Sequence, residues 1–297
     1  MASAFGTEFT PEMIISWFDG QRWGKPEFVP SDTLALHPAS HVLHYASTCF
    51  EGLKAFRHDD GSINLFRMDR NVARFEQSAR LMALPAIDTD MTARMIVDIV
   101  ERFRNAVPQP PGSMYIRPTL IGTEPSIGKA AAPSATGCQY VLLSPVGDYF
   151  SSGAAALRLL VDDVGMRCAP HNGMIKCGGN YASALRHILQ ARAEHDADQV
   201  LFCPGGDVQE TGAANFLLIE GGEVVTKALD ETFLHGVTRE SVLTLARDAG
   251  YTVSERELSV DELLERATRA DAECALSGTA AVLTPVGTLI YGGREVT

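Results

Sequence analysis

The chain has 297 residues, of which 45% are hydrophobic and 21% are charged, as in an ordinary globular protein. At roughly 100–200 residues per domain, this length predicts two domains or one large one, and it excludes a disordered tail or a small disulfide scaffold. The 37 acidic residues outnumber the 25 Lys and Arg residues, for a net charge of -12. Such a surface repels phosphate backbones and anionic membranes, so neither nucleic acid nor a membrane is expected as a partner.

The N-terminus and the cysteines indicate the compartment. Residues 1–10 lack the apolar segment of a secretory signal peptide. The longest uncharged runs, 130–147 and 275–293, are interrupted by Pro, Gly, Ser and Thr, so they do not predict membrane spans. The six cysteines form no CxxC pair, and we expect reduced thiols. Together these features predict a cytoplasmic protein.

The first half of the chain alternates between strand and helix patterns. Strand patterns cover 14–18, 41–50, 53–56, 63–66, 115–121 and 139–144. Between them, apolar residues at helical spacing predict one helix from Val72 to Met82, ended by Pro85. A second helix is predicted from an N-cap at Asp90 to Val107, ended by Pro108.

Small residues fill 147–156, and we place an interdomain linker at 149–156, between a domain at 1–148 and a larger domain at 157–297. The second domain is expected to contain strands at 157–161 and 199–203, a helix starting just after Asn180, and a hairpin of 215–219 and 223–227. One helix should run from near Thr238 to Gly250, and Ser259 with Glu262 should cap another. The mixture predicts two α/β or α+β domains with a cleft between them.

Lysine is scarce, with five residues against twenty arginines, and Lys176 lies in an unusual setting. Its neighbours in 173–179 are apolar residues, glycine and one cysteine. Apolar surroundings favour an uncharged amine, because desolvation disfavours the ammonium, and such an amine can form a Schiff base with a carbonyl. The alternative, from spacing alone, is an ordinary lysine that extends to solvent at the end of a strand.

Two other motifs compete with Lys176 as the functional centre. Residues 122–130 resemble a phosphate loop, but the glycine spacing is one residue too long, Ala130 takes the place of Ser or Thr, and Pro125 restricts the loop. A nucleotide triphosphate site is therefore disfavoured. The histidines at 37, 41 and 44 lack a metal-ligand pattern, and no metal is expected.

Two turns could bind anions. Residues 236–238 precede a helix, so their N–H groups suit a phosphate, and 277–280 form a turn of small residues between apolar strands. A plain helix cap and a plain turn are the alternatives.

Seven segments, in family order from about Tyr45 to Thr279, resemble those of the branched-chain aminotransferases, which are fold-type IV pyridoxal-phosphate enzymes. The segments are LHYASTCFEGLKAF (43–56), LFRMDRNVAR (65–74), YIRPTLIG (115–122), KCGGNY (176–181), QETGAANF (209–216), GVTR (236–239) and SGTA (277–280). The resemblance implies a two-domain fold with pyridoxal 5'-phosphate in the cleft, and a homodimer or higher homo-oligomer. It also implies transamination of leucine, isoleucine and valine with 2-oxoglutarate as acceptor.

The resemblance further implies roles for individual residues. Lys176 would hold the cofactor aldehyde as an imine and move a proton between the substrate Cα and cofactor C4′. Glu210 would face the pyridine nitrogen, and Tyr181 the 3′ oxygen. The cofactor phosphate would contact Arg74, Gly236, Val237, Thr238, Gly278 and Thr279. The substrates, which are amino acids and 2-oxo acids, would contact Tyr45, Phe50, Tyr115, Arg117 and Ala280.

Three positions depart from the family pattern and leave the substrate open. Ala182 stands where relatives often have Gly, Ala213 where some have Thr, and His235 where Pro is common. The nearest alternatives are other fold-type IV enzymes, namely a D-amino acid aminotransferase, an aminodeoxychorismate lyase or a specialised biosynthetic transaminase. A more distant alternative is a non-catalytic protein that retains the fold.

Overall fold

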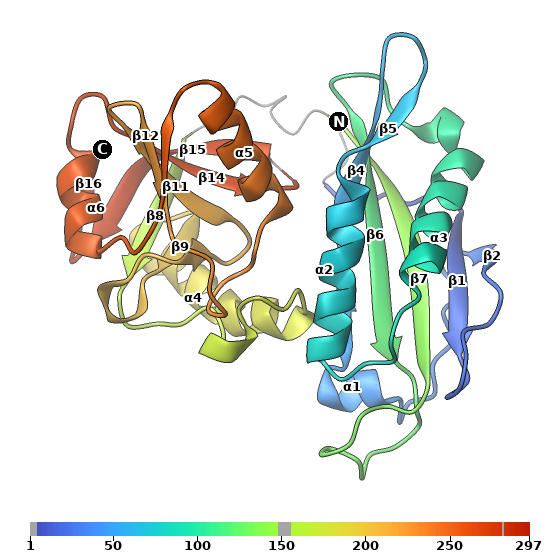
Figure 1. Ribbon diagram of the computed structural model, residues 1–297. Coiled ribbons are helices and arrows are strands. Elements are labelled where there is room, and N and C mark those ends of the chain that lie inside the picture. Colours follow the sequence, from blue (N-terminus) through green and yellow to red (C-terminus); the bar gives the residue numbers. More distant parts are fainter. Residues whose placement is uncertain (1–4, 148–155, 281) are drawn as a thin grey trace. The chain divides into compact units, whose positions relative to one another are not determined.

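A computed structural model describes residues 5–147, 156–280 and 282–297 and divides the chain into two compact units (Figure 1). The first unit comprises the described residues of the first 151 positions together with Ile175–Gly178, and the second comprises those of Ser152–Met174 with Gly179–Thr297. The expected linker, 149–156, lies outside the described residues except for Ala156. The expected boundary places Lys176 in the C-terminal domain, whereas the structure groups Ile175–Gly178 with the first unit.

The first unit is built on a seven-stranded sheet in which every pairing is antiparallel. The strand order is β2-β1-β7-β6-β4-β5, and β3 also pairs with β6. The strands are β1 (Glu12–Phe18), β2 (Glu27–Pro30), β3 (Thr48–Phe50), β4 (Leu53–Arg57), β5 (Ile63–Leu65), β6 (Ser113–Gly122) and β7 (Gly137–Val146).

Helices α2 (Met68–Leu81) and α3 (Thr89–Arg102) cover one face of this sheet, and a 3-10 turn, η1 (Arg104–Ala106), follows α3 (Figure 1). Helix α1 (His41–Tyr45) packs on the opposite face, where Val42 lies against the core of Met13, Ile15, Ile121 and Cys138. Met95, Ile96 and Ile99 of α3 pack in one core with Ile116 of β6 and Leu143 of β7. Because side chains alternate along a strand, the residues between these core positions on β6 and β7 lie on the opposite face.

Three local predictions in this unit are wrong. The helix expected to run to Val107 ends at Arg102, and the 3-10 turn η1 follows it. The strand expected at 41–50 is a helix, α1, followed by the short strand β3, since His41 is buried and its ring bonds Ser47 and the carbonyl of Ala132. The N-cap of α3 is Asp88 rather than Asp90, because the Asp88 side chain accepts the N–H of Met91 at 2.8 Å.

The second unit is built on a mixed nine-stranded sheet of order β10-β9-β8-β15-β14-β11-β12-β13, and β16 pairs with β15. Three pairings are parallel, those of β8 with β9, β8 with β15, and β12 with β13. The strands are β8 (Leu157–Asp162), β9 (Gln199–Phe202), β10 (Glu210–Thr211), β11 (Asn215–Glu220), β12 (Glu223–Thr226), β13 (Thr252–Glu255), β14 (Glu273–Gly278), β15 (Val282–Tyr291) and β16 (Arg294–Val296).

The helices of the second unit are α4 (Gly178–His195), α5 (Val237–Asp248) and α6 (Val260–Ala267), with 3-10 turns η2 (Pro170–Asn172) and η3 (Pro204–Gly206). Helix α4 begins before Asn180 rather than after it, whereas the predicted cap of α6 is confirmed, because Ser259 Oγ accepts the N–H of Glu262 at 3.1 Å. Within the described ranges, no helix is long and apolar enough to cross a bilayer.

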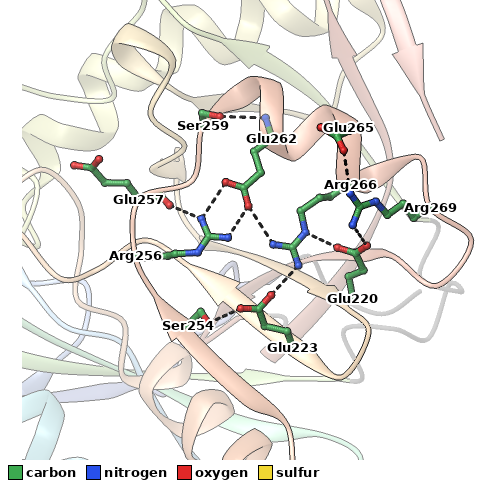
Figure 2. A network of polar contacts seen from close by, with 10 residues as sticks. All are labelled: Glu220, Glu223, Ser254, Arg256, Glu257, Ser259, Glu262, Glu265, Arg266 and Arg269. Carbon is green, nitrogen blue, oxygen red and sulfur yellow. Dashed lines mark hydrogen bonds and ion pairs between the residues drawn. The ribbon is translucent and has the colours of Figure 1, made fainter.

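The predicted hairpin of β11 and β12 is confirmed, with Glu220 opposite Glu223 and positive φ at Gly221 and Gly222, as a two-residue hairpin turn requires. An ion-pair network holds this end of the hairpin to α6 (Figure 2). Arg266 bonds Glu220 and also contacts Glu223 at 2.9 Å and Glu262 at 3.1 Å. The two-unit mixture of sheets and helices agrees with the predicted α/β class.

Candidate active site

Lys176 lies two residues before α4, and its backbone is bound on both sides to elements of the first unit. Its N–H donates to Ser78 Oγ of α2 at 3.1 Å, and its carbonyl accepts the N–H of Phe50 in β3 at 3.0 Å. The Nζ atom lies 5.3 Å from the centroid of the Phe50 ring. The main chain of the lysine is therefore fixed, and its amine faces an aromatic ring.

A buried ion pair lies near this lysine. Arg74 of α2 donates from Nε to Glu51 Oε1 at 2.6 Å and from Nη2 to Glu51 Oε2 at 2.9 Å, while Asn71 donates to Oε2 at 2.7 Å. Burial by itself would raise the pKa of Glu51, but the charges of Arg74 and Lys176 and the bonds from Arg74 and Asn71 lower it below its usual value. Arg74, which is expected at the phosphate, is thus bound to a carboxylate that sequence reasoning did not single out.

A cavity of about 400 Å³ lies in the first unit. It is lined by alternate residues of two paired strands, Tyr115, Arg117 and Thr119 of β6 and Tyr140, Leu142 and Ser144 of β7, with Phe5, Gly6, Phe9 and Phe50. The expected substrate residues Phe50, Tyr115 and Arg117 are brought together here. Tyr45 is not among the lining residues, since its hydroxyl donates to the carbonyl of Ile127 at 2.6 Å.

Arg117 gives this cavity its charge. Its guanidinium lies over the rings of Phe50 and Tyr115, at 4.5 and 5.2 Å from their centroids, and Nη2 donates to the Tyr115 hydroxyl at 2.8 Å. Within the described residues, Arg117 Nε is buried with no hydrogen-bond partner. A Cβ on Gly52 would fall 2.1 Å from the Tyr115 hydroxyl, so any side chain there would displace that hydroxyl. Aromatic walls around a guanidinium suit both an aliphatic group and a carboxylate.

The second unit holds Glu210 at the start of β10, with 2% of its surface exposed. Its Oε1 lies 2.8 Å from Arg167 Nη1 and accepts the N–H of Leu234 at 2.9 Å, while Oε2 accepts from Asn215 Nδ2 at 3.2 Å. The Arg167 guanidinium also lies 5.6 Å from the centroid of the Tyr181 ring. Arg167 therefore connects the two residues expected at the cofactor ring, and sequence reasoning did not identify it.

Asn215 connects Glu210 to the two anion-binding turns. Gly236 begins α5 without a side-chain cap, and a Cβ on it would lie 2.1 Å from Asn215 Oδ1. Asn215 also lies opposite Ser277 in the pairing of β11 with β14, and Gly278, which ends β14, precedes the turn of Thr279 and Ala280. The first N–H groups of α5, at Val237 and Thr238, have no partner within the helix, so they suit an anion.

These groups fit a phosphorylated pyridine. A buried carboxylate suits a protonated ring nitrogen, and the N–H groups at the start of α5 suit a phosphate. All lie in the second unit and are connected through Asn215. The fit requires no metal, and the described residues contain no group of three or more His, Cys, Asp or Glu that could hold one.

Comparison with known proteins defines the class. The family model of class IV amino-transferases matches residues 48–289, so the chain belongs to this class of aminotransferases. Branched-chain-amino-acid transaminase 1 of Bacillus subtilis is 39% identical over 98% of this chain and 83% of its own length. The cytosolic branched-chain-amino-acid aminotransferase of Mus musculus is 40% identical over 98% of this chain and 78% of its own.

A solved structure agrees. The T.th. branched-chain amino acid aminotransferase, in complex with N-(5'-phosphopyridoxyl)-L-glutamate, is 26% identical, with a TM-score of 0.76 over 95% of this chain and 87% of that chain. The same enzyme has been solved with 4-methylvaleric acid. The chain belongs to the branched-chain aminotransferase family, and its fold is fold-type IV.

Proposed function

We propose that this enzyme transfers the amino group of leucine, isoleucine or valine to 2-oxoglutarate, with pyridoxal 5'-phosphate as its cofactor. The observation that carries the proposal is the cluster around Asn215, which joins the buried Glu210 carboxylate to the N-terminus of α5 and the end of β14. The solved relative with a phosphopyridoxyl-glutamate adduct and with 4-methylvaleric acid supports a site that takes both an acidic and a branched aliphatic ligand.

The cofactor, when bound, supplies a conjugated ring that accepts electron density from the substrate Cα. In the proposal, Glu210 keeps the ring nitrogen protonated and Tyr181 hydrogen-bonds the 3′ oxygen. The phosphate is bound by N–H and hydroxyl groups at Val237, Thr238 and Thr279, beside Gly236 and Gly278, and by Arg74.

Lys176 is the catalytic residue of the proposal. Its Nζ would hold the cofactor through the aldehyde and, when free, would carry a proton between the substrate Cα and cofactor C4′. The bonds of its backbone to Ser78 and Phe50 fix the main chain from which the amine extends.

Substrate choice is assigned to the cavity of the first unit. The rings of Phe50 and Tyr115 contact an aliphatic side chain, and Arg117 binds the distal carboxylate of glutamate or 2-oxoglutarate. The proposal also places the α-carboxylate on the turn of Thr279 and Ala280, and Tyr45 beside the substrate. We further infer that the enzyme is cytoplasmic and forms a homodimer or higher homo-oligomer. Sedimentation of the purified protein tests the oligomeric state.

The experiment is a panel of amino donors and 2-oxo acids on the cofactor-loaded protein, with Lys176→Ala as its control. Leucine, isoleucine and valine should react with 2-oxoglutarate, and K176A should lose turnover while its circular dichroism stays that of the wild type. Preference for D-alanine, or release of pyruvate from aminodeoxychorismate, would replace the substrate assignment. Transamination by a clean K176A preparation would remove Lys176 from the mechanism.

A further inference from the structure

Arg167 is as fully buried as the carboxylate that it contacts. The side chains of Arg167 and Glu210 are each 2% exposed, and Nη1 lies 2.8 Å from Oε1. Nε donates to the carbonyl of Gly212 at 3.2 Å, and the guanidinium lies near the Tyr181 ring. A single cation therefore contacts both residues that the proposed function places against the cofactor ring.

Because Glu210 is buried, the positive charge of Arg167 affects whether this carboxylate is ionised. An isolated carboxylate removed from water is neutralised by taking up a proton, unless a cation or several donors stabilise its charge. Glu210 also accepts hydrogen bonds from two neutral groups, the Leu234 N–H and the Asn215 amide. Arg167 supplies the positive charge, and its fork of N–H groups holds the orientation of the carboxylate.

We propose that Arg167 is a positioning residue that keeps Glu210 ionised, so that the proton between Glu210 and the pyridine nitrogen of the cofactor resides on the nitrogen. The inference rests on the proposed function, which places Glu210 against that nitrogen. The guanidinium contacts the carboxylate directly, so it lowers the proton affinity of the carboxylate more than that of any group beyond it. Without this charge the proton moves to Glu210 and the ring loses its ability to accept electron density.

Two variants separate charge from shape. Arg167→Gln keeps a long side chain with hydrogen-bond donors but removes the charge, whereas Arg167→Lys keeps the charge but loses the planar fork. The matched control is Arg266→Gln, which breaks another Arg–Glu contact of the same unit, that with Glu220 (Figure 2). Glu220 and Asn215 occupy opposite ends of β11, about 17 Å apart along the strand, so the control is remote from Glu210.

The main readout is the ¹⁵N NMR signal of the protein loaded with ring-¹⁵N-labelled pyridoxal 5'-phosphate, which distinguishes a protonated from a neutral nitrogen. We expect a protonated signal in the wild type, R167K and R266Q, and a neutral signal in R167Q. Cofactor binding to R167Q should weaken on the order of tenfold, because a charge-assisted hydrogen bond becomes a neutral one. A protonated nitrogen in R167Q, or equal shifts in R167Q and R167K, would overturn the proposal.

A second readout needs no cofactor. The infrared spectrum of cofactor-free R167Q should show the band of a protonated carboxyl group that is absent from the wild type and from the double variant R167Q/E210Q. Absence of this band in R167Q overturns the proposed role of Arg167. If the band appears but the wild type shows no protonated ring nitrogen, the assignment of Glu210 to the cofactor fails, so the two failures are distinguishable.

Discussion

Replacing Glu51 by glutamine tests the charge arrangement beside Lys176. Glu51 is fully buried, and its two oxygens receive the bidentate contact of Arg74 at 2.6 and 2.9 Å. Glutamine has nearly the same size but no charge, so E51Q leaves a buried guanidinium without its counter-ion. Removing one partner of a buried ion pair costs about 3–5 kcal/mol, and because glutamine retains one acceptor oxygen we expect about 3 kcal/mol.

The chain offers a specific assay. Both of its tryptophans, Trp17 and Trp23, belong to the first unit, so their fluorescence reports the unfolding of that unit. For a unit of about 150 residues, a loss of about 3 kcal/mol lowers Tm by roughly 6–12 °C. The matched control is Glu12→Gln, because Glu12 pairs with Arg102 on the surface of the same unit, where such pairs contribute about 1 kcal/mol or less. Equal losses in E51Q and E12Q would refute the reasoning.

The same pair predicts a pH dependence. The pKa of Glu51 is lower in the folded protein than in the unfolded chain, where glutamate titrates at about 4.3. The contribution of its charge to stability is therefore present above that pH and is lost as the pH falls through the folded value. The advantage of the wild type over E51Q should be constant above about pH 5 and should shrink below about pH 4. An undiminished difference in strong acid would contradict this assignment.

Three further substitutions follow from the site. Arg117→Ala should reduce kcat/KM for 2-oxoglutarate on the order of tenfold to a hundredfold more than for leucine, because only 2-oxoglutarate has a distal carboxylate, and equal losses would make Arg117 structural. Gly52→Ala should raise KM for both substrates, since its Cβ would displace the Tyr115 hydroxyl, and unchanged kinetics would contradict this. Gly236→Ala should weaken cofactor binding in a fluorescence titration, because its Cβ would collide with Asn215, and wild-type affinity would argue against a phosphate there.

Local signals predicted those elements whose cause is local. The hairpin of β11 and β12 was predicted because Gly221-Gly222 supplies the positive φ that the turn needs. The cap of α6 was predicted because Ser259 and Glu262 have the spacing of a capping box. Helix α1 could not be predicted in the same way. Its start depends on the burial of His41 and on a bond to the carbonyl of Ala132, 91 residues away. Contacts of this range override short-range pattern.

Some residues of the candidate site were predicted from local motifs, whereas others depend on how the strands pair. The motif residues Phe50, Tyr115 and Arg117 were expected together, and they line one cavity. Their partners Tyr140 and Ser144 were not expected, because only the register of β6 with β7 places Ser144 opposite Tyr115 and Tyr140 opposite Thr119. A strand shows which of its residues share a face, but its neighbour in the sheet is fixed by the fold.

Lys176 and Arg167 differ in how easily they could be identified from the sequence. The chain has only four lysines besides Lys176, so Lys176 was recognisable by its residue type and its apolar surroundings. It has nineteen arginines besides Arg167, and Arg167 belongs to none of the recognised motifs, so the sequence did not distinguish it. Only burial and the 2.8 Å contact with Glu210 separate it from a surface arginine such as Arg104, whose contact with Glu101 is largely exposed. Loss of one partner from an exposed Arg–Glu pair changes the free energy of unfolding little, because water screens the remaining charge. Loss of one partner from a buried pair is costly, because the remaining charge is left without solvent. The sequence therefore indicated the carboxylate that we propose to face the cofactor ring, whereas the arginine that pairs with it was identified only in the folded structure.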